Sequence, residues 1–353
     1  MNRQYYLDLA ARGLRVPIAT HLILHEQPDP EKVLLDGRRL ASVMADTADR
    51  FQIPLALSVM DLALENEVML ETIAIPEAGP AHYQFERLPA EDIRSRIHKG
   101  MDVLGNRRMK ADCEALARIA DRGRLLPVGM AIGPFSLLTK LVKDPITPIF
   151  LAGSGQTARD SEEVAMMEAL LSMAEDVVHA SCIAQCRAGA KAVLVCEPAA
   201  NAVYFSPNQI RQKDSKIFSQ YVIEPNRRLK ALFDAQDCDL LLHDCGELIP
   251  EMVSAFAVLD PALISFGSPV TLWEMAPFVP NTTVIFGNLP TKKFYSEEEM
   301  PVEKVEALAR EICERMKSTG HPFILGSECD VLSVPGCERI IMEKVMAFHR
   351  LRC

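Results

Sequence analysis

Eight short runs of consecutive apolar residues recur along the chain, and segments with helical periodicity separate them. Runs that are apolar at nearly every position, rather than at alternate positions, are typical of parallel strands buried on both faces. The predicted strands are residues 16–22, 53–60, 126–131, 191–196, 239–243, 262–266, 283–287 and 322–327.

Amphipathic segments at 37–51, 161–190 and 301–320 predict helices, and Gly320 is a usual helix stop. Eight strands that alternate with helices predict an α/β fold, a single (β/α)8 TIM barrel. A doubly wound open sheet is the alternative. It is disfavoured because no G-x-G-x-x-G motif follows the first strand.

One barrel domain over residues 1–353 accounts for the length, since α/β barrels commonly exceed 250 residues. The chain shows no internal repeat and no low-complexity linker. Residues 76–100 are polar and rich in proline. We predict that they form an insertion or a covering segment over one end of the barrel.

Composition excludes several classes of protein. The net charge of -10 and the lack of a Lys/Arg run argue against nucleic-acid binding. No apolar stretch is long enough to cross a membrane, and the N-terminus lacks the apolar core of a signal peptide. A cytoplasmic location is therefore expected. There the ten cysteines would be packing residues, metal ligands or reactive thiols rather than a disulfide framework.

The candidate chemistry lies at strand ends. His243 ends the fifth predicted strand in "DLLLHDCGELIP", and Cys245 follows by two residues, a spacing that places both side chains on one side of a strand. In a barrel all carboxyl ends of strands surround one mouth, so Cys329, just beyond the eighth strand, is the predicted third ligand. One histidine and two cysteines suit Zn²⁺ and leave one tetrahedral position open, as catalytic zinc sites do.

Burial without function is the competing interpretation of any cysteine. It is preferred for four cysteines that lie inside predicted strands or helices: Cys182, Cys186, Cys196 and Cys313. Cys337 is a competing zinc ligand, although its place near a helix start favours packing. Glu247 is a candidate fourth ligand in the resting state.

Acidic residues form a second candidate group. Asp61, Glu65 and Glu67 follow the second strand, and Asp61 and Glu65 would share a face if the segment is helical. Glu197 directly follows the fourth strand, and His21 lies at the end of the first. These side chains are candidates for binding substrate. The alternative for the acidic residues after the second strand is that they lie in solvent at the start of a helix. The alternative for His21 is that it is a core histidine whose hydrogen bonds are made within the protein.

Six stretches in the same order resemble the methylcobamide:thiol methyltransferases of the uroporphyrinogen decarboxylase superfamily. The most specific are "LHDCG" and "ILGSECDV", which contain His243, Cys245 and Cys329; the looser ones are "LSVMDLALENEVML", "VGMAIGPFSLLTKLV", "QCRAGAKAVLVCEPAA" and "VIFGNLPT". The resemblance implies a (β/α)8 barrel with one Zn²⁺ per chain. It also implies methyl transfer from a methylated corrinoid (cobalamin-type) protein, a partner of one-carbon metabolism, to a small thiol such as coenzyme M.

Departures from the superfamily bear on the substrate. Uroporphyrinogen decarboxylases carry an N-terminal motif ending in R-Q-A-G-R-Y, which Arg12 and Arg15 do not reproduce. In the methyltransferases asparagine often stands where this chain has Glu247. The corrinoid-binding pattern D-x-H-x-x-G is also absent, so the cofactor would arrive on a partner.

Three other functions remain open on the sequence. One is a metal-free decarboxylase of porphyrinogens or other acids, and another is a corrinoid-binding barrel without catalysis. A zinc hydrolase is the third, and it fits the cysteine-rich ligand set poorly, because two cysteinates weaken zinc as a Lewis acid. Within the methyltransferase interpretation, homocysteine, another small thiol or a pterin competes with coenzyme M as the acceptor.

Overall fold

The computed structural model describes residues 3–74 and 83–351. Its strands form one sheet in which each paired neighbour runs parallel. The strands are β1 (Arg15–Val16), β2 (Leu55–Leu57), β3 (Leu126–Ile132), β4 (Ala192–Cys196), β5 (Asp239–Asp244), β6 (Leu263–Phe266), β7 (Val284–Leu289) and β8 (Phe323–Ser327).

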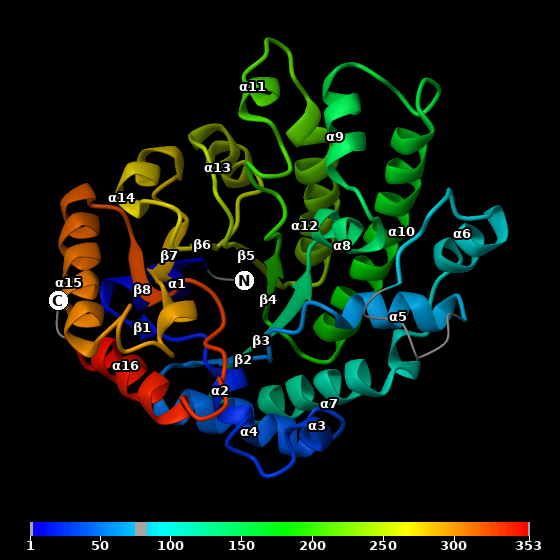
Figure 1. Ribbon diagram of the computed structural model, residues 1–353. Coiled ribbons are helices and arrows are strands. Elements are labelled where there is room, and N and C mark those ends of the chain that lie inside the picture. Colours follow the sequence, from blue (N-terminus) through cyan, green and yellow to red (C-terminus); the bar gives the residue numbers. More distant parts are fainter. Residues whose placement is uncertain (1–2, 75–82, 352–353) are drawn as a thin grey trace.

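The strand order, β1-β8-β7-β6-β5-β4-β3-β2, is that of a barrel in which each strand lies beside the next one along the chain. The sheet curls until β1 and β2, its two ends, come near each other (Figure 1). The described residues of these two strands share no ladder, but the Thr20 hydroxyl donates to the Leu57 carbonyl at 2.9 Å. The fold is a (β/α)8 barrel, as predicted.

Helices follow each strand and surround the sheet (Figure 1). The α-helices are α1 (Gln4–Ala11), α2 (Thr20–Leu24), α3 (Pro30–Val33), α4 (Gly37–Arg50), α5 (Leu64–Thr72), α6 (Glu91–His98), α7 (Arg107–Arg122), α8 (Pro134–Leu141), α9 (Ile146–Gly153), α10 (Glu162–Arg187), α11 (Pro207–Ile210), α12 (Glu224–Ala235), α13 (Pro250–Ala257), α14 (Leu272–Met275), α15 (Val302–Thr319) and α16 (Glu338–Arg350). Single turns of 3-10 or π helix are η2 (Val103–Gly105), η3 (Ser219–Ile223), η4 (Ala276–Phe278) and η5 (Thr291–Lys293).

Local sequence explains the bounds of the long helices. The Asp36 carboxylate accepts hydrogen bonds from the backbone N–H groups of Arg38 and Arg39 and so caps the start of α4. Gly320 ends α15 in the left-handed conformation, with φ of 69°. The three helices predicted at 37–51, 161–190 and 301–320 are confirmed as α4, α10 and α15.

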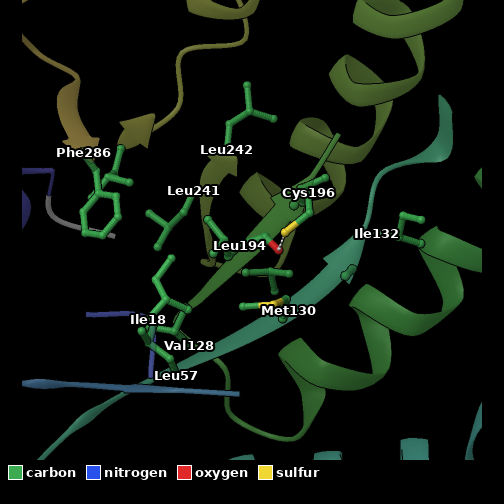
Figure 2. Packing of buried hydrophobic residues seen from close by; sticks show 14 of the residues in the cluster. Ile18, Leu57, Val128, Met130, Ile132, Leu194, Cys196, Leu241, Leu242 and Phe286 are labelled. Atoms are coloured by element: carbon green, nitrogen blue, oxygen red, sulfur yellow. Dashed lines mark hydrogen bonds between the residues drawn. The ribbon is translucent and has the colours of Figure 1, made fainter. Parts of the chain in front are cut away.

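The interior of the barrel is a packed apolar core rather than a pore. Ile18, Leu57, Leu194, Leu241 and Phe286 point toward one another across it (Figure 2).

A glycine in β8 makes room for the largest of these side chains. A Cβ atom at Gly326 would lie 2.1 Å from Cζ of Phe286, so only glycine accommodates the aromatic ring at this position. The bottom and middle of the barrel are thereby filled, which leaves the carboxyl ends of the strands as the place for polar chemistry.

The first predicted strand is wrong in extent. Residues 16–22 were expected to be extended, but β1 ends at Val16 and α2 begins at Thr20. Pro17 has no N–H to donate to a ladder, and the Ile18 N–H donates to the Ser327 hydroxyl at 3.0 Å instead of to a backbone carbonyl. His21 therefore lies in a short helix and not at a strand end. The seven other predicted strands overlap observed ones.

Two further expectations concern parts of the chain away from the barrel mouth. The predicted covering segment at 76–100 lies partly outside the described residues; its described part contains α6, which packs against α5 and α10. Cys182, Cys186 and Cys196 are free thiols, but Cys313 is disulfide-bonded, so the expectation of a free thiol is wrong there. No helix in the described ranges is both long and apolar enough to cross a membrane.

Candidate metal centre

Three potential metal ligands converge at the mouth of the barrel. His243 lies at the end of β5, Cys245 follows it, and Cys329 follows β8. One ligand atom from each of these residues lies within 4.8 Å of the other two. In the described part of the chain this is the one such group of three or more histidine, cysteine or acidic side chains.

The neighbouring strand orients the His243 imidazole. His243 and Ser265 are partners in the register of β5 and β6, and Nδ1 lies 2.9 Å from the Ser265 Oγ. When Nδ1 carries the proton and donates it to the hydroxyl, Nε2 keeps its lone pair. Nε2 is buried and has no hydrogen-bond partner. A buried nitrogen with a free lone pair beside two thiols is suited to bind a metal ion.

Close packing of backbone fixes the position of Cys245. A Cβ atom at Gly267, just after β6, would lie 2.5 Å from the Cys245 carbonyl oxygen and 2.6 Å from its Cα. The Asn288 amide donates to the Gly267 carbonyl at 2.8 Å and holds that loop in place. On the other side, the buried Asp244 carboxylate accepts from the Gly246 N–H at 2.7 Å. The loop that carries Cys245 is therefore held from both sides.

Glu328 ties Cys329 to the loops that follow the two preceding strands. Its backbone N–H donates to the Leu289 carbonyl at 2.7 Å. One carboxylate oxygen accepts from the Ser268 hydroxyl at 2.5 Å, and the other accepts from the Lys292 N–H at 3.1 Å. Because Glu328 directly precedes Cys329, these bonds fix the chain next to the ligand.

The two thiols differ in their readiness to ionise. A hydrogen bond from the Cys329 thiol lowers the pKa of Cys245, and His243 and Lys292 lower it further, against the opposing effect of burial. The pKa of Cys329 is raised in turn by the same hydrogen bond and by burial. The Lys292 ammonium lies 3.8 Å from the Cys245 sulfur. A thiolate at Cys245 is therefore stabilised before any ion is bound.

The donor set fits a zinc ion. Thiolate and imidazole ligands suit Zn²⁺ better than they suit Mg²⁺ or Ca²⁺, which prefer oxygen. Two further candidates stand apart: neither the exposed Glu247 nor Cys337, at the start of α16, belongs to the group of converging ligand atoms. The group thus supplies three protein ligands, the number typical of a zinc site that keeps a position for substrate.

The chain is similar to known proteins in its sequence and in its fold. The sequence model described as "Uroporphyrinogen decarboxylase (URO-D)" matches residues 24–341, nine-tenths of the chain. The chain belongs to the uroporphyrinogen decarboxylase family. A solved structure named as a methyltransferase from Methanosarcina mazei is similar over 99% of this chain and 98% of that one, with a TM-score of 0.67 and 15% sequence identity. That likeness shows the shared fold. No curated protein matches the chain.

In this member of the URO-D family, two of the predicted substrate carboxylates are engaged in buried hydrogen bonds. Glu65 lies in α5, where it accepts from the Ser181 hydroxyl at 2.8 Å, and burial raises its pKa to about 7. Glu197 accepts from the N–H groups of Phe135 at 3.2 Å and Ser136 at 2.8 Å, at the start of α8. Asn226 donates to the same carboxylate at 2.7 Å. The Glu65 carboxylate thus joins α5 to α10, and the Glu197 carboxylate joins the end of β4 to α8 and α12.

Asp61 lies in the segment between β2 and α5, and His21 lies in α2. Asp61 precedes α5 instead of lying on its face with Glu65, and it pairs with Arg108, which also binds Glu67 at 2.8 Å. His21 accepts from the Ser333 N–H at 3.2 Å, and its ring stacks on His25.

Burial, together with the charge of His25, lowers the pKa of His21 to about 4. His21 is therefore neutral at neutral pH.

Ser265, Glu328 and Lys292 were missed by the sequence-based prediction. All three lie in or just after strands, at the same edge of the sheet as the ligands. The barrel rule, applied to the seventh strand as it was to the fifth and eighth, points to "NLPTKK" and so to Lys292.

Proposed function

We propose that this chain is a zinc-dependent methyltransferase that moves a methyl group from a methylated corrinoid protein to a small thiol. The convergence of His243, Cys245 and Cys329 at the barrel mouth carries the proposal. The URO-D fold and the methyltransferase with a similar fold support it. We expect one Zn²⁺ per chain and action in the cytoplasm.

His243, Cys245 and Cys329 would hold the zinc, and the ion, when bound, keeps an acceptor thiol in its thiolate form near neutral pH. Two cysteinates and a neutral histidine cancel the charge of the ion. Ser265 keeps the histidine in the tautomer whose Nε2 faces the thiols. This charge balance favours an electron-rich sulfur over a Lewis-acidic site, which is why we prefer alkyl transfer to sulfur over hydrolysis.

The reaction balances without a further co-reactant. The acceptor loses its thiol proton to solvent, its sulfur forms a bond to the methyl carbon, and the cobalt–carbon bond breaks with both electrons left on cobalt as Co(I). The products are a methyl thioether and the reduced corrinoid. The chain lacks the D-x-H-x-x-G pattern, so a separate corrinoid protein would present the methyl group at the barrel mouth.

Metal analysis tests whether the three ligands bind zinc, on which the proposed function depends. Purified wild-type protein should contain about one zinc per chain, and Cys245→Ala and Cys329→Ala should each lose it. Cys337→Ala is the matched control, because this half-buried cysteine stands outside the ligand group and should leave zinc content unchanged. A wild type that takes up no zinc on reconstitution would rule out the mechanism.

Activity is the second test. Zinc-loaded wild type, given methylcobalamin and a panel of small thiols, should form a methyl thioether and Co(I), and the two cysteine variants should not. The corresponding assay with a methylated corrinoid protein tests the partner.

Decarboxylation of a porphyrinogen is the second candidate, favoured by membership of the URO-D family. It would proceed equally in the Cys245→Ala and Cys329→Ala variants, because it does not use the three ligands. Carbon dioxide release from a porphyrinogen by metal-free protein would establish this alternative in place of methyl transfer.

A further inference from the structure

One sulfur atom of the metal centre accepts a hydrogen bond from a cation. Lys292 lies in η5, the turn that follows β7, and its ammonium nitrogen is 3.8 Å from the Cys245 Sγ. Within residues 3–74 and 83–351, no other lysine or arginine bonds to one of the three ligands, and no carboxylate forms an ion pair with this ammonium group. The positive charge is therefore directed at a single ligand sulfur.

The main chain holds Lys292 in this place. Its N–H donates to one carboxylate oxygen of Glu328 at 3.1 Å, while the other oxygen accepts from the Ser268 hydroxyl at 2.5 Å. Glu328 directly precedes Cys329, so the turn that carries the lysine is tied to the loop that carries the third ligand. The contact between the ammonium group and the Cys245 sulfur thus starts from a fixed backbone.

The second cysteine ligand has different surroundings. The Cys329 thiol lies 3.7 Å from the Met60 thioether sulfur, which carries no charge. Both ligand cysteines are only partly buried, so a small electrophile has access to either sulfur. A charge-assisted hydrogen bond lowers the basicity of a thiolate, and the nucleophilicity of a sulfur falls with its basicity. Of the two ligands, Cys245 is the one whose reactivity is reduced in this way.

A methyltransferase with cysteinate ligands has a side reaction to avoid, because the methyl donor approaches two ligand sulfurs as well as the acceptor sulfur. If a ligand sulfur attacked, it would form a bond to the methyl carbon, and the leaving group would keep the electron pair of the bond that breaks. The ligand would become an uncharged thioether, whereas the thiolate is the form that binds metal. The metal centre would then be lost.

We infer that Lys292 protects Cys245 from methylation and so directs the methyl group to the acceptor. This inference rests on the proposed function. The ammonium group withdraws electron density from the Cys245 sulfur, which leaves the acceptor sulfur as the better nucleophile. Lys292 acts through Cys245, and it contacts neither the methyl group nor the acceptor in this role.

Alkylation of the zinc-loaded protein tests this without corrinoid or acceptor. Iodomethane supplies the methyl group, iodide leaves with the electron pair, and peptide mapping by mass spectrometry gives the rate at each cysteine. Methylation of Cys245 should be about 3- to 30-fold faster in Lys292→Gln than in wild type. An adjacent opposite charge changes basicity about 10- to 1000-fold, and the nucleophilicity of sulfur follows with about half that exponent. Lys292→Arg should restore the slow rate.

Two internal references and one variant control the measurement. Cys329 in the same molecules should change much less than Cys245. The free thiol of Cys337, outside the ligand group, reports the dose of reagent. Lys293→Gln is the matched control, since it removes a neighbouring charge that is already paired with Glu299 at 3.4 Å, and it should leave the rate at Cys245 unchanged. Zinc content is measured on every sample before the reagent is added.

The outcomes separate the inference from the proposed function. Equal rates at Cys245 in zinc-loaded wild type and Lys292→Gln would overturn the inference and leave the methyltransferase proposal in place. An equal rise at Cys245 and Cys329 would also overturn it, because the lysine would then hold the whole centre together and not shield one sulfur. If wild type took up no zinc, the proposed function would fail, and this inference with it.

Discussion

His243 and Ser265 face each other across two adjacent strands, and the serine hydroxyl lies 2.9 Å from Nδ1 of the imidazole. The hydroxyl can orient the ring so that Nε2 points to the two thiols. Mutation of a residue that hydrogen-bonds to the non-ligating nitrogen of a metal-binding histidine commonly lowers metal affinity by about 10–100-fold. The strand register of the barrel therefore contributes directly to the metal centre.

Ser265→Ala should lower zinc affinity by about tenfold and leave the stoichiometry at saturating zinc unchanged, because the ring loses its orienting hydroxyl but remains in place. Competition with a chromophoric chelator measures the affinity. Ser181→Ala is the control, since it removes a buried hydroxyl that is bonded to Glu65 instead. Equal affinities of Ser265→Ala and wild type would show that the hydroxyl has no part in metal binding.

The substitution Gly267→Ala should disturb the metal centre by displacing the backbone of Cys245. The new Cβ would meet the main chain of Cys245 at 2.5–2.6 Å, so the loop that carries this ligand must shift. We expect about 1–3 kcal/mol of lost stability, the usual cost of overpacking, together with weaker zinc binding.

Thermal unfolding and metal analysis measure the two effects of Gly267→Ala. Gly105→Ala is the control, because its Cβ would come no closer than 3.4 Å to Asp102. Full zinc content in Gly267→Ala would contradict the role given to this close approach.

The sequence was sufficient to predict the barrel and the three converging ligands. His243, Cys245 and Cys329 follow apolar runs, and the rule that strand ends share one mouth brings them together without knowledge of the loops. The short β1 was not predictable from apolar pattern alone, since "VPIATHL" is apolar in either conformation and Pro17 and the hydroxyls of Thr20 and Ser327 decide the outcome.

The supporting residues of the centre depend on register and loop geometry, which apolar patterns do not specify. Ser265 is recognisable only when β5 and β6 are aligned residue by residue. Lys292 and Glu328, 36 residues apart in sequence, are joined by a hydrogen bond from the Lys292 main-chain N–H to the Glu328 carboxylate. The spacing of Asp61 and Glu65 suggested that they share one face of a helix. In the structure α5 begins after Asp61, and of these two carboxylates only that of Glu65 is buried.

The substitution Asp61→Asn should lower the stability of the fold and leave the binding of zinc and of thiols unchanged. Its carboxylate is paired with Arg108 in a partly exposed ion pair, so the expected loss is about 0.5–1 kcal/mol in free energy of unfolding. Urea denaturation measures it, and Glu67→Gln, which removes the other partner of Arg108, should behave similarly. Zinc content and thiol affinity should match wild type. A loss of thiol affinity without a loss of stability would instead support a substrate-binding role for Asp61.

Glu65→Gln should change how stability depends on pH. Burial raises the pKa of Glu65 from 4.5 to about 7, and the hydrogen bonds from Ser181 and the backbone only partly offset this. Between these two values the folded chain retains a proton that the unfolded chain has released, so this group lowers stability as the pH rises through that window. Glutamine, which does not titrate, removes the effect.

The free energy of unfolding of Glu65→Gln, relative to wild type, should therefore increase by about 2 kcal/mol from about pH 5 to about pH 8. Urea denaturation of both proteins at the two pH values gives the difference. The exposed Glu303→Gln serves as the control and should follow wild type at both. Parallel pH dependence of Glu65→Gln and wild type would mean that the folded chain holds Glu65 ionised, and the buried carboxylate would then need a compensating charge among its neighbours.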